Sequence, residues 1–391
     1  MLGVGILLPL IGFESGDPDS SLYAAIASDL STRPVSQWMA PEWWGHWNIE
    51  GFFREHPVGI FLPSALLASL GYPAAQAAYL VNAVYQVLTL IAIQRLAAFY
   101  VPGAVARSLA WIVQLLPIAF AYRIRANHEQ AVVLCLITAL YATVRSRSDA
   151  RWMVVTTLAF LYMFLVKGLL VAFAPISCAW LLLVSRWASP RQAVHDVYAW
   201  AGLAVAVVVT GVAAGLYEVV YLFTTGESFY AVYLGKWTSL GFQTAAQPWV
   251  LQKANNFFWY LGRLLWFAFP WSLAACWAMW SIMGHFDQIR SESPLGRYDL
   301  QTRRALTGLV IGLGVVALYI GLLSLSNHRT DRYLFPGYIV LGACGAAVAG
   351  WDRGSARRTV LAMDRWHPYT PMLVYCAGFV LYLASRLTVW L

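Results

Sequence analysis

The chain has 391 residues, of which 60% are hydrophobic and only 11% are charged, and its mean hydropathy is +0.62. Because soluble domains carry about 25% charged residues, this composition excludes an ordinary soluble protein and predicts an integral membrane protein. The net charge of +8 does not indicate a nucleic-acid partner, because the basic residues fall between apolar segments, as the positive-inside rule explains.

The chain starts with a short apolar segment, residues 1–13. It offers an apolar run of only about a dozen residues, where a spanning helix needs about 20. It also lacks the basic region and small-residue cleavage site of a signal peptide. We interpret it either as a shortened first helix or as one whose true beginning lies upstream.

A long polar interruption follows at residues 14–57, with seven acids, two histidines (His46 and His56) and a tryptophan cluster. Acids and histidines are costly at a membrane, so this stretch is where we expect chemistry. If the next apolar stretch, residues 58–70, crossed the membrane, every later loop would lie on the opposite side of the membrane from the side that its charges indicate. We therefore predict a juxtamembrane or re-entrant helix there.

The rest of the chain consists of apolar segments separated by short polar turns. With the first segment they predict an all-α fold, a polytopic transmembrane bundle of about eleven helices in a single domain over residues 1–391, without a C-terminal soluble domain. The later segments are residues 75–96, 106–126, 131–144, 152–166, 168–184, 198–223, 256–283, 305–326, 333–351 and 369–390.

Arginine-rich loops alternate with loops that hold few basic residues, which predicts that the arginine-rich loops share the cytoplasmic side. The polar segments on the opposite, outer side are then residues 14–57, 127–130, 224–253 and 327–332, together with the turn at Lys167. Residues 14–57 form the first outer loop, with amphipathic helices, and residues 224–253 form the second large one.

Asp17 and Asp19 open a segment with Leu22, Ile26 and Leu30 on one helical face, so both acids are expected at a helix N-terminus near the membrane surface. Two interpretations stay open. Asp19 or Ser20 caps the helix, as Asp-Ser sequences usually do, or the acids take part in chemistry.

Basic and acidic residues also gather at the other outer turns. His128 and Glu129 follow Arg123 and Arg125, which either snorkel to the surface or bind an anion.

Further along the chain, His328, Arg329 and Arg332 either anchor lipid headgroups or bind a lipid phosphate, because guanidinium fits phosphate oxygens. Lys167 either snorkels or faces a cavity as a counter-charge. His46 and His56 lack the close spacing of metal ligands, and no metal site is predicted.

Several short stretches, in order along the chain, resemble the motifs of the GT-C membrane glycosyltransferases, in particular the aminoarabinose-transferase and protein O-mannosyltransferase group. Residues 19–24 (DSSLYA) resemble the acidic-pair pattern DE-x-x-Y-A, except that Ser20 replaces the second acid, which Asp17 would then supply. Residues 55–57 (EHP) are similar to the element that ends the first outer loop.

Three further motifs lie downstream. Glu129 is similar to the second acid of the family, and residues 166–168 (VKG) to its T/S-K-G element, with Val in the first position. Residues 332–336 (RYLFP) match R-Y-x-x-P.

The resemblance implies an enzyme that takes a sugar from a polyprenyl-phosphate donor at the outer membrane face and passes it to a lipid, glycan or protein acceptor. Asp19 would be the general base, and Asp17 and Glu129 would position the substrates. Residues expected to bind substrate, many of them around the donor phosphate, are Tyr23, His56, Arg123, Arg125, His128, Lys167, His328, Arg329, Arg332 and Tyr333.

The resemblance also implies a bacterial inner membrane with the site facing the periplasm, and a role in the cell envelope such as lipopolysaccharide modification. A divalent metal is compatible with some relatives, but Ser20 weakens the acidic pair that would hold it, so none is predicted as required.

Two other functions fit a membrane protein with outer charges. A transporter or flippase of an amphiphilic envelope precursor would keep such charges too, although transporters commonly show inverted repeats and a midplane site, and here the charges cluster on one side. A non-catalytic envelope scaffold would tolerate neutralisation of the outer carboxylates.

Overall fold

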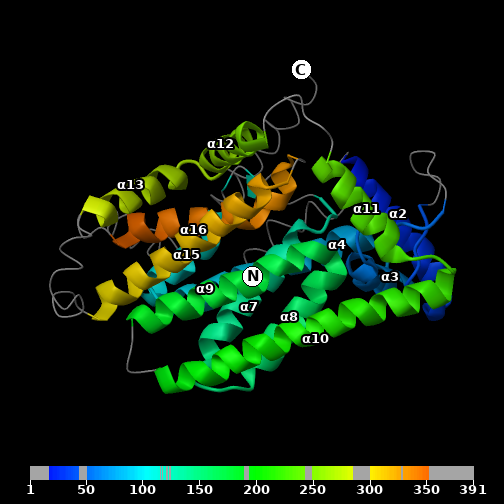
Figure 1. The fold of residues 1–391 in the computed structure, drawn as a ribbon, viewed down its shortest axis with the longest axis horizontal. Coiled ribbons are helices and arrows are strands. Elements are labelled where there is room, and N and C mark those ends of the chain that lie inside the picture. Colours follow the sequence, from blue (N-terminus) through cyan, green and yellow to red (C-terminus); the bar gives the residue numbers. More distant parts are fainter. Residues whose placement is uncertain are drawn as a thin grey trace.

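The computed structural model describes residues 17–43, 51–114, 116, 118–119, 122, 125–188, 193–242, 249–284, 300–326 and 329–351. This part of the chain is helical, and its β structure is one isolated bridge between Glu42 and Phe52. The predicted all-α class is therefore confirmed (Figure 1). The segments predicted at residues 1–13 and 369–390 lie outside the described residues.

The helices follow one another through short connections. The α-helices are α2 (Pro18–Thr32), α3 (Leu62–Ser69), α4 (Ala74–Ala97), α5 (Gly103–Gln114), α7 (Glu129–Ser146), α8 (Trp152–Lys167), α9 (Phe173–Ala188), α10 (Ala193–Thr225), α11 (Phe229–Phe242), α12 (Trp249–Phe267), α13 (Trp271–Gly284), α15 (Leu300–Ser324) and α16 (Phe335–Trp351). Short 3₁₀ turns are η2 (Val35–Gln37), η4 (Val58–Ile60), η5 (Gly168–Ala172) and η7 (Asp331–Leu334).

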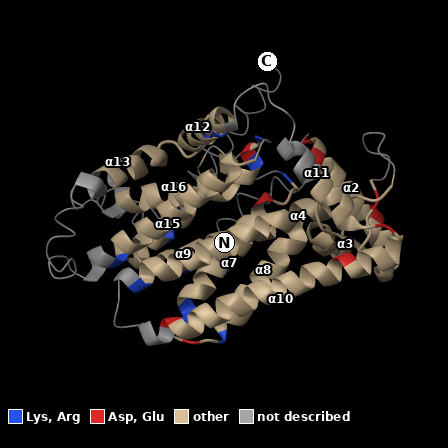
Figure 2. Ribbon diagram, viewed as in Figure 1, with Lys and Arg blue, Asp and Glu red and all other residues tan. Residues whose placement is uncertain are grey.

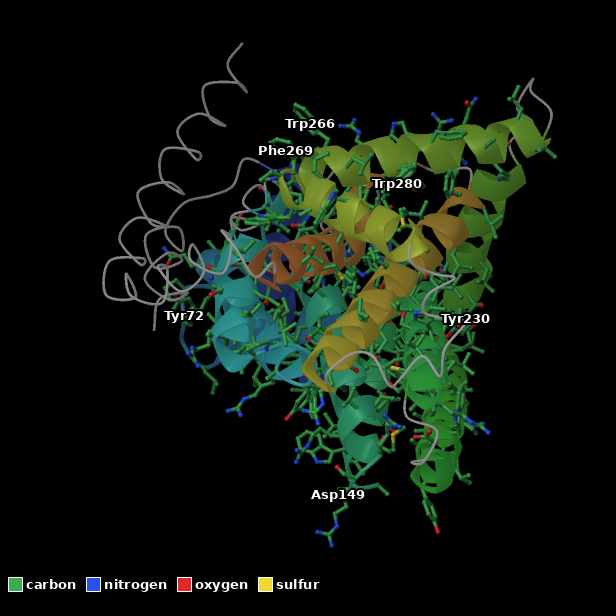
Figure 3. The ribbon with its side chains drawn as sticks, turned by 90° about the vertical axis from the view of Figure 1, so that its left-hand side faces the viewer. Tyr72, Asp149, Tyr230, Trp266, Phe269 and Trp280 are labelled. Atoms are coloured by element: carbon green, nitrogen blue, oxygen red, sulfur yellow. The ribbon has the colours of Figure 1, made fainter. Side chains whose placement is uncertain are left out.

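Apolar helices of membrane-spanning length support an integral membrane protein. Among the described residues, 4 helices are long and apolar enough to cross a bilayer: Ala74–Ala97, Trp152–Arg186, Asp196–Thr225 and Arg304–Ser324. Large apolar side chains also face outwards, among them Trp266, Phe269 and Trp280 on the α12–α13 hairpin (Figure 3). Such side chains are stable when they contact lipid tails rather than water.

The segment after the first outer loop does not form a spanning helix. η4 covers three residues and α3 covers eight, which is far below the roughly 20 that a crossing requires. α3 packs against α2 and α4. These lengths fit the juxtamembrane helix expected from the loop charges.

Helix direction brings distant polar turns to one end of the bundle. α7 packs between α4 and α8, and it begins at Glu129 and ends beside Arg147. α8 runs back and ends at Lys167, so Glu129 and Lys167 share the end opposite the arginines. Figure 2 shows acids gathered around α2 and α11, whereas the far ends of α9 and α15 carry basic residues.

Candidate functional site

The helix that carries the two candidate acids, α2, begins with Asp17 as its N-cap. One oxygen of Asp17 accepts hydrogen bonds from the Ser20 amide at 3.1 Å and the Ser20 hydroxyl at 2.7 Å. Asn127 donates to the same oxygen at 3.4 Å, and Arg125 lies 3.6 Å from the other. Asp17 therefore caps the helix, so the expectation that Asp19 or Ser20 does so is wrong: the break at Pro18 places the cap one residue before it.

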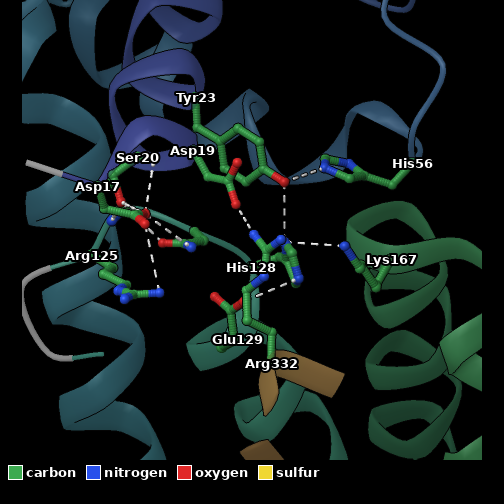
Figure 4. A network of polar contacts seen from close by, with 12 residues as sticks. Asp17, Asp19, Ser20, Tyr23, His56, Arg125, His128, Glu129, Lys167 and Arg332 are labelled. Carbon is green, nitrogen blue, oxygen red and sulfur yellow. Dashed lines mark hydrogen bonds and ion pairs between the residues drawn. The ribbon is translucent and has the colours of Figure 1, made fainter. Parts of the chain in front are cut away.

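Asp19 faces a different partner. Its carboxylate forms an ion pair with Arg332, which lies in η7 immediately before α16 (Figure 4). The Asp19 side chain keeps 33% of its surface exposed, so a substrate can reach it. The two acids of the GDPD sequence thus take separate positions, one capping the helix and one open to the site.

A buried network lies beside this pair and is centred on the Tyr23 hydroxyl. The hydroxyl lies 2.7 Å from Nε2 of His56 and 3.2 Å from Nδ1 of His128. The Lys167 ammonium lies 3.4 Å from the same Nδ1 (Figure 4). All four side chains are buried, which brings the first outer loop, the α7 turn and the end of α8 into one cluster.

The network sets the proton positions on His128. An ammonium group can only donate, so Nδ1 of His128 accepts from Lys167, and Nε2 carries the proton that faces Glu129 Oε1 at 3.3 Å. Burial lowers the pKa of His128 well below its ordinary range, and the charges of Lys167 and His56 lower it further. Burial raises the pKa of Glu129. His128 is therefore a neutral imidazole between a cation and an acid.

Lys167 sits at a sharp turn between α8 and η5. Gly168 follows it with φ of +58°, a conformation that favours glycine. The Lys167 ammonium lies 5.3 Å from the centre of the Tyr333 ring, within cation–π range. The turn holds a buried positive charge at the C-terminal end of α8, facing Tyr333. The interpretation that Lys167 snorkels into solvent is therefore wrong, because its side chain is buried.

Residues 55–214, less than half of the chain, match the family model described as dolichyl-phosphate-mannose-protein mannosyltransferase. The crystal structure of ArnT from Cupriavidus metallidurans, bound to undecaprenyl phosphate, superposes with a TM-score of 0.59 at 15% identity over 93% of this chain and 62% of that chain. The chain has the GT-C fold. The motif-based resemblance is confirmed at this level.

Two archaeal structures share the GT-C fold. The Archaeoglobus fulgidus oligosaccharyltransferase in complex with Zn and sulfate has a TM-score of 0.53 at 14% identity, over 97% of this chain and 53% of that chain. The oligosaccharyltransferase AglB from the same organism, with an inhibitory peptide and a dolichol-phosphate, has a TM-score of 0.50 at 12% identity, over 96% of this chain and 55% of that one. The chain thus spans less than two thirds of these relatives, and no curated protein matches it by sequence.

Arg329 and Arg332, both in the turn predicted at residues 327–332, point in different directions. Arg332 and Tyr333 reach Asp19 and Lys167, as described. Arg329 instead donates from Nε to the Asn256 amide oxygen at 2.7 Å and is turned towards α12. Of the other predicted substrate-binding residues, Arg123 and His328 lie outside the described residues, as does His46.

Two asparagines that none of the sequence motifs indicated also support the site. Asn127 is buried. Its amide oxygen lies 3.1 Å from the Ser20 hydroxyl, and its amide nitrogen donates to Asp17. Asn82, on α4, donates to the carbonyl oxygen of Arg125. The available signal was a carboxamide inside or beside an apolar segment, where an unsatisfied polar group is costly and usually has a specific partner.

The acids do not form a metal-binding group in the described part of the chain. Asp17 is occupied by Ser20 and Asn127, whereas Asp19 faces Arg332. No three His, Cys, Asp or Glu side chains among the described residues lie where they could hold a metal ion together. Ser20 also donates its hydroxyl hydrogen within the cap. The side chains at this end of α2 therefore do not provide the ligand atoms of a two-carboxylate metal site.

Proposed function

We propose that this protein is a membrane glycosyltransferase that moves a sugar from a polyprenyl-phosphate donor to a lipid, glycan or protein acceptor at the outer membrane face. The observation that supports it best is the partly exposed Asp19 carboxylate, paired with Arg332 beside the buried Lys167 cation on a GT-C fold. The polyprenyl phosphates bound to ArnT and AglB support the choice of donor.

In the proposed reaction, Asp19 acts as the general base. The acceptor hydroxyl oxygen attacks C1 of the sugar while its proton passes to the Asp19 carboxylate. The bond between C1 and the phosphate oxygen breaks, and its electron pair leaves with the lipid phosphate. This single displacement inverts the configuration at C1. Asp17 positions Asp19 by fixing the first turn of α2, and Glu129 positions His128.

Positive charge stabilises the leaving phosphate. Lys167 and Arg332 are placed to contact it, because a preorganised cation in a buried site acts where negative charge develops. Tyr23, His56 and His128 orient Lys167 through the buried network. When the donor binds, its phosphate competes with Asp19 for Arg332, and the released carboxylate becomes a better base. Arg125, which lies against Asp17, completes the proposed substrate-binding surface.

The same proposal includes the location and the cofactor requirement. We place the protein in a bacterial inner membrane with the site facing the periplasm, acting on a cell-envelope acceptor such as lipopolysaccharide. No divalent metal is required in this mechanism, because Lys167 and Arg332 supply the positive charge at the leaving phosphate. Transfer in membranes treated with EDTA is expected to equal transfer in untreated membranes, and a loss restored by added Mg²⁺ or Mn²⁺ would refute this part.

The test compares Asp19→Asn with Asp29→Asn, which is the same change on the same helix. Asp29 lies away from the site and forms an ion pair with Arg33, with 2.7 Å between the two side chains. Envelope glycolipids, glycans and proteins from a deletion strain carrying each variant are measured by mass spectrometry. With Asp19→Asn, one sugar is expected to disappear from one acceptor while its polyprenyl-phosphate donor accumulates; Asp29→Asn is expected to restore it.

The opposite outcome distinguishes the alternatives. If the deletion alters the envelope and Asp19→Asn restores it fully, Asp19 is not the base. A transporter or a scaffold then explains the phenotype better, since neither needs a proton acceptor at this position.

A further inference from the structure

The turn that carries Lys167 is held by a tyrosine from a distant helix. The Tyr233 hydroxyl, on α11, accepts a hydrogen bond from the Leu169 amide at 2.9 Å and donates one to the Lys167 carbonyl at 3.3 Å. It thereby joins the backbone on both sides of Gly168, where α8 ends and η5 begins. One side chain thus closes the turn.

The fit between Tyr233 and Gly168 is close. A Cβ atom at residue 168 would collide with the Tyr233 hydroxyl, and the φ of +58° at Gly168 already favours glycine. Tyr233 itself is buried, with its ring stacked on Phe229 at 5.2 Å between centroids. The hydroxyl therefore has little freedom to leave the turn.

The backbone of Lys167 determines where its ammonium group lies. From this turn the side chain reaches Nδ1 of His128 at 3.4 Å and the Tyr333 ring at 5.3 Å. A turn with a glycine in an unusual conformation has other accessible shapes once its hydrogen bonds are removed. In those shapes the ammonium would move relative to His128 and to Tyr333.

We propose that Tyr233 is a positioning residue that fixes Lys167 for binding the phosphate of the donor lipid. This inference rests on the proposed function, because it assumes that Lys167 contacts the phosphate. It assigns a role to α11, part of the second outer loop, which none of the motifs indicated. Tyr233 touches the backbone of Lys167 rather than the substrate.

The test measures binding of undecaprenyl phosphate, without sugar, to the full chain in detergent micelles. Tyr233→Phe keeps the ring and removes both hydrogen bonds, and it is expected to weaken binding about fivefold, as for the loss of neutral hydrogen bonds. The matched control is Tyr230→Phe, on the same helix, whose hydroxyl donates to the Ala214 carbonyl at 3.0 Å. The control is expected to bind as the wild type does.

A double-mutant cycle separates positioning from a general structural effect. Lys167→Ala alone is expected to weaken binding at least tenfold, the order reported for groups that contact charge directly. Adding Tyr233→Phe to Lys167→Ala is expected to cause no further loss, because Tyr233 acts through Lys167. A merely structural role of Tyr233 would instead lower affinity equally in both backgrounds.

Each result has a definite meaning. If Lys167→Ala weakens binding and Tyr233→Phe does not, or if the two losses add in full, the positioning role is wrong and the phosphate site stands. If the wild-type protein does not bind undecaprenyl phosphate, or Lys167→Ala binds it equally well, the phosphate site of the proposed function fails, and this inference fails with it.

Discussion

Asp19, in the second position of α2, forms an ion pair with Arg332, in the 3₁₀ turn before α16. The pair joins the segment of residues 14–57 to the turn before α16 and puts a carboxylate and a guanidinium side by side. Asp17, two residues earlier, is turned into the helix cap. The structure thus gives the two acids of one short sequence different partners.

Arg332→Gln is expected to lower sugar transfer about 100-fold, the order found when one preorganised stabilising group is removed. Arg332→Lys keeps the charge but not the planar fork, and it is expected to retain intermediate activity. The measurement is the initial rate of transfer in membrane vesicles. Arg329→Gln serves as control, because Arg329 faces Asn256, and it should stay within a few fold of the wild type. Equal losses at both arginines would contradict a specific role for Arg332.

The buried imidazole of His128 makes stability depend on pH. Its pKa in the folded protein is lowered, whereas the unfolded chain binds a proton near pH 6.5. Below that pH the unfolded state binds more protons, so the stabilising contribution present above about pH 6.5 is lost as the pH falls.

Protonation of Glu129, whose pKa is raised, acts in the opposite direction in this range, so the prediction is a comparison of two proteins. On acidification from pH 7.5 to 5.5, the change in the thermal midpoint in detergent is expected to be more negative in the wild type than in His128→Gln. Ser69→Ala, at an exposed position that carries no titratable group, is the control and should follow the wild type. Parallel curves for wild type and His128→Gln would show that another group controls the pH response.

The Ser20 hydroxyl contacts Asp17, Asn127 and the Ala126 amide, although Ser20 stands where the family motif has an acid. Its hydroxyl donates to Asp17 at 2.7 Å and accepts from the Ala126 amide at 2.9 Å. Ser20→Ala leaves that buried amide without a partner and is expected to destabilise the protein by about 1–3 kcal/mol. Ser21→Ala is the control, because Ser21 makes only a 3.4 Å contact with the Asp17 carbonyl. Equal denaturant midpoints for the two variants would contradict the importance of this contact.

Another ion pair, with a buried acid, lies at the opposite end of the bundle. Arg147 Nε lies 2.6 Å from Asp196, whose side chain is 3% exposed. Asp196→Asn leaves the arginine without its counter-charge and is expected to cost about 3–5 kcal/mol of stability.

Because this pair is far from the site, undecaprenyl phosphate affinity of the folded variant should be unchanged. Asp149→Asn, at an exposed position near the same end, is the control and should melt as the wild type does. A selective loss of lipid binding in Asp196→Asn would show coupling between the two ends.

The sequence by itself determined the all-α membrane class of the protein and the end of the molecule where the candidate site lies. Apolar length and loop charge are local properties, so they predicted the all-α class and placed residues 127–130 and Lys167 on one side, but the predicted segment 256–283 is divided between α12 and α13 in the structure. Motif order was enough to identify the GT-C resemblance. The juxtamembrane or re-entrant helix predicted at residues 58–70 also followed from charge parity alone.

Only the tertiary structure decided which side chains meet. Whether Asp17 or Asp19 faces Arg332 depends on where α2 begins and how it is rotated against its neighbours, and no local pattern encodes that rotation. The contact of Tyr233 with the Lys167 turn likewise joins helices far apart in sequence. Such pairs form when packed helices fix one another's depth and rotation, so they are properties of the whole bundle rather than of any one segment.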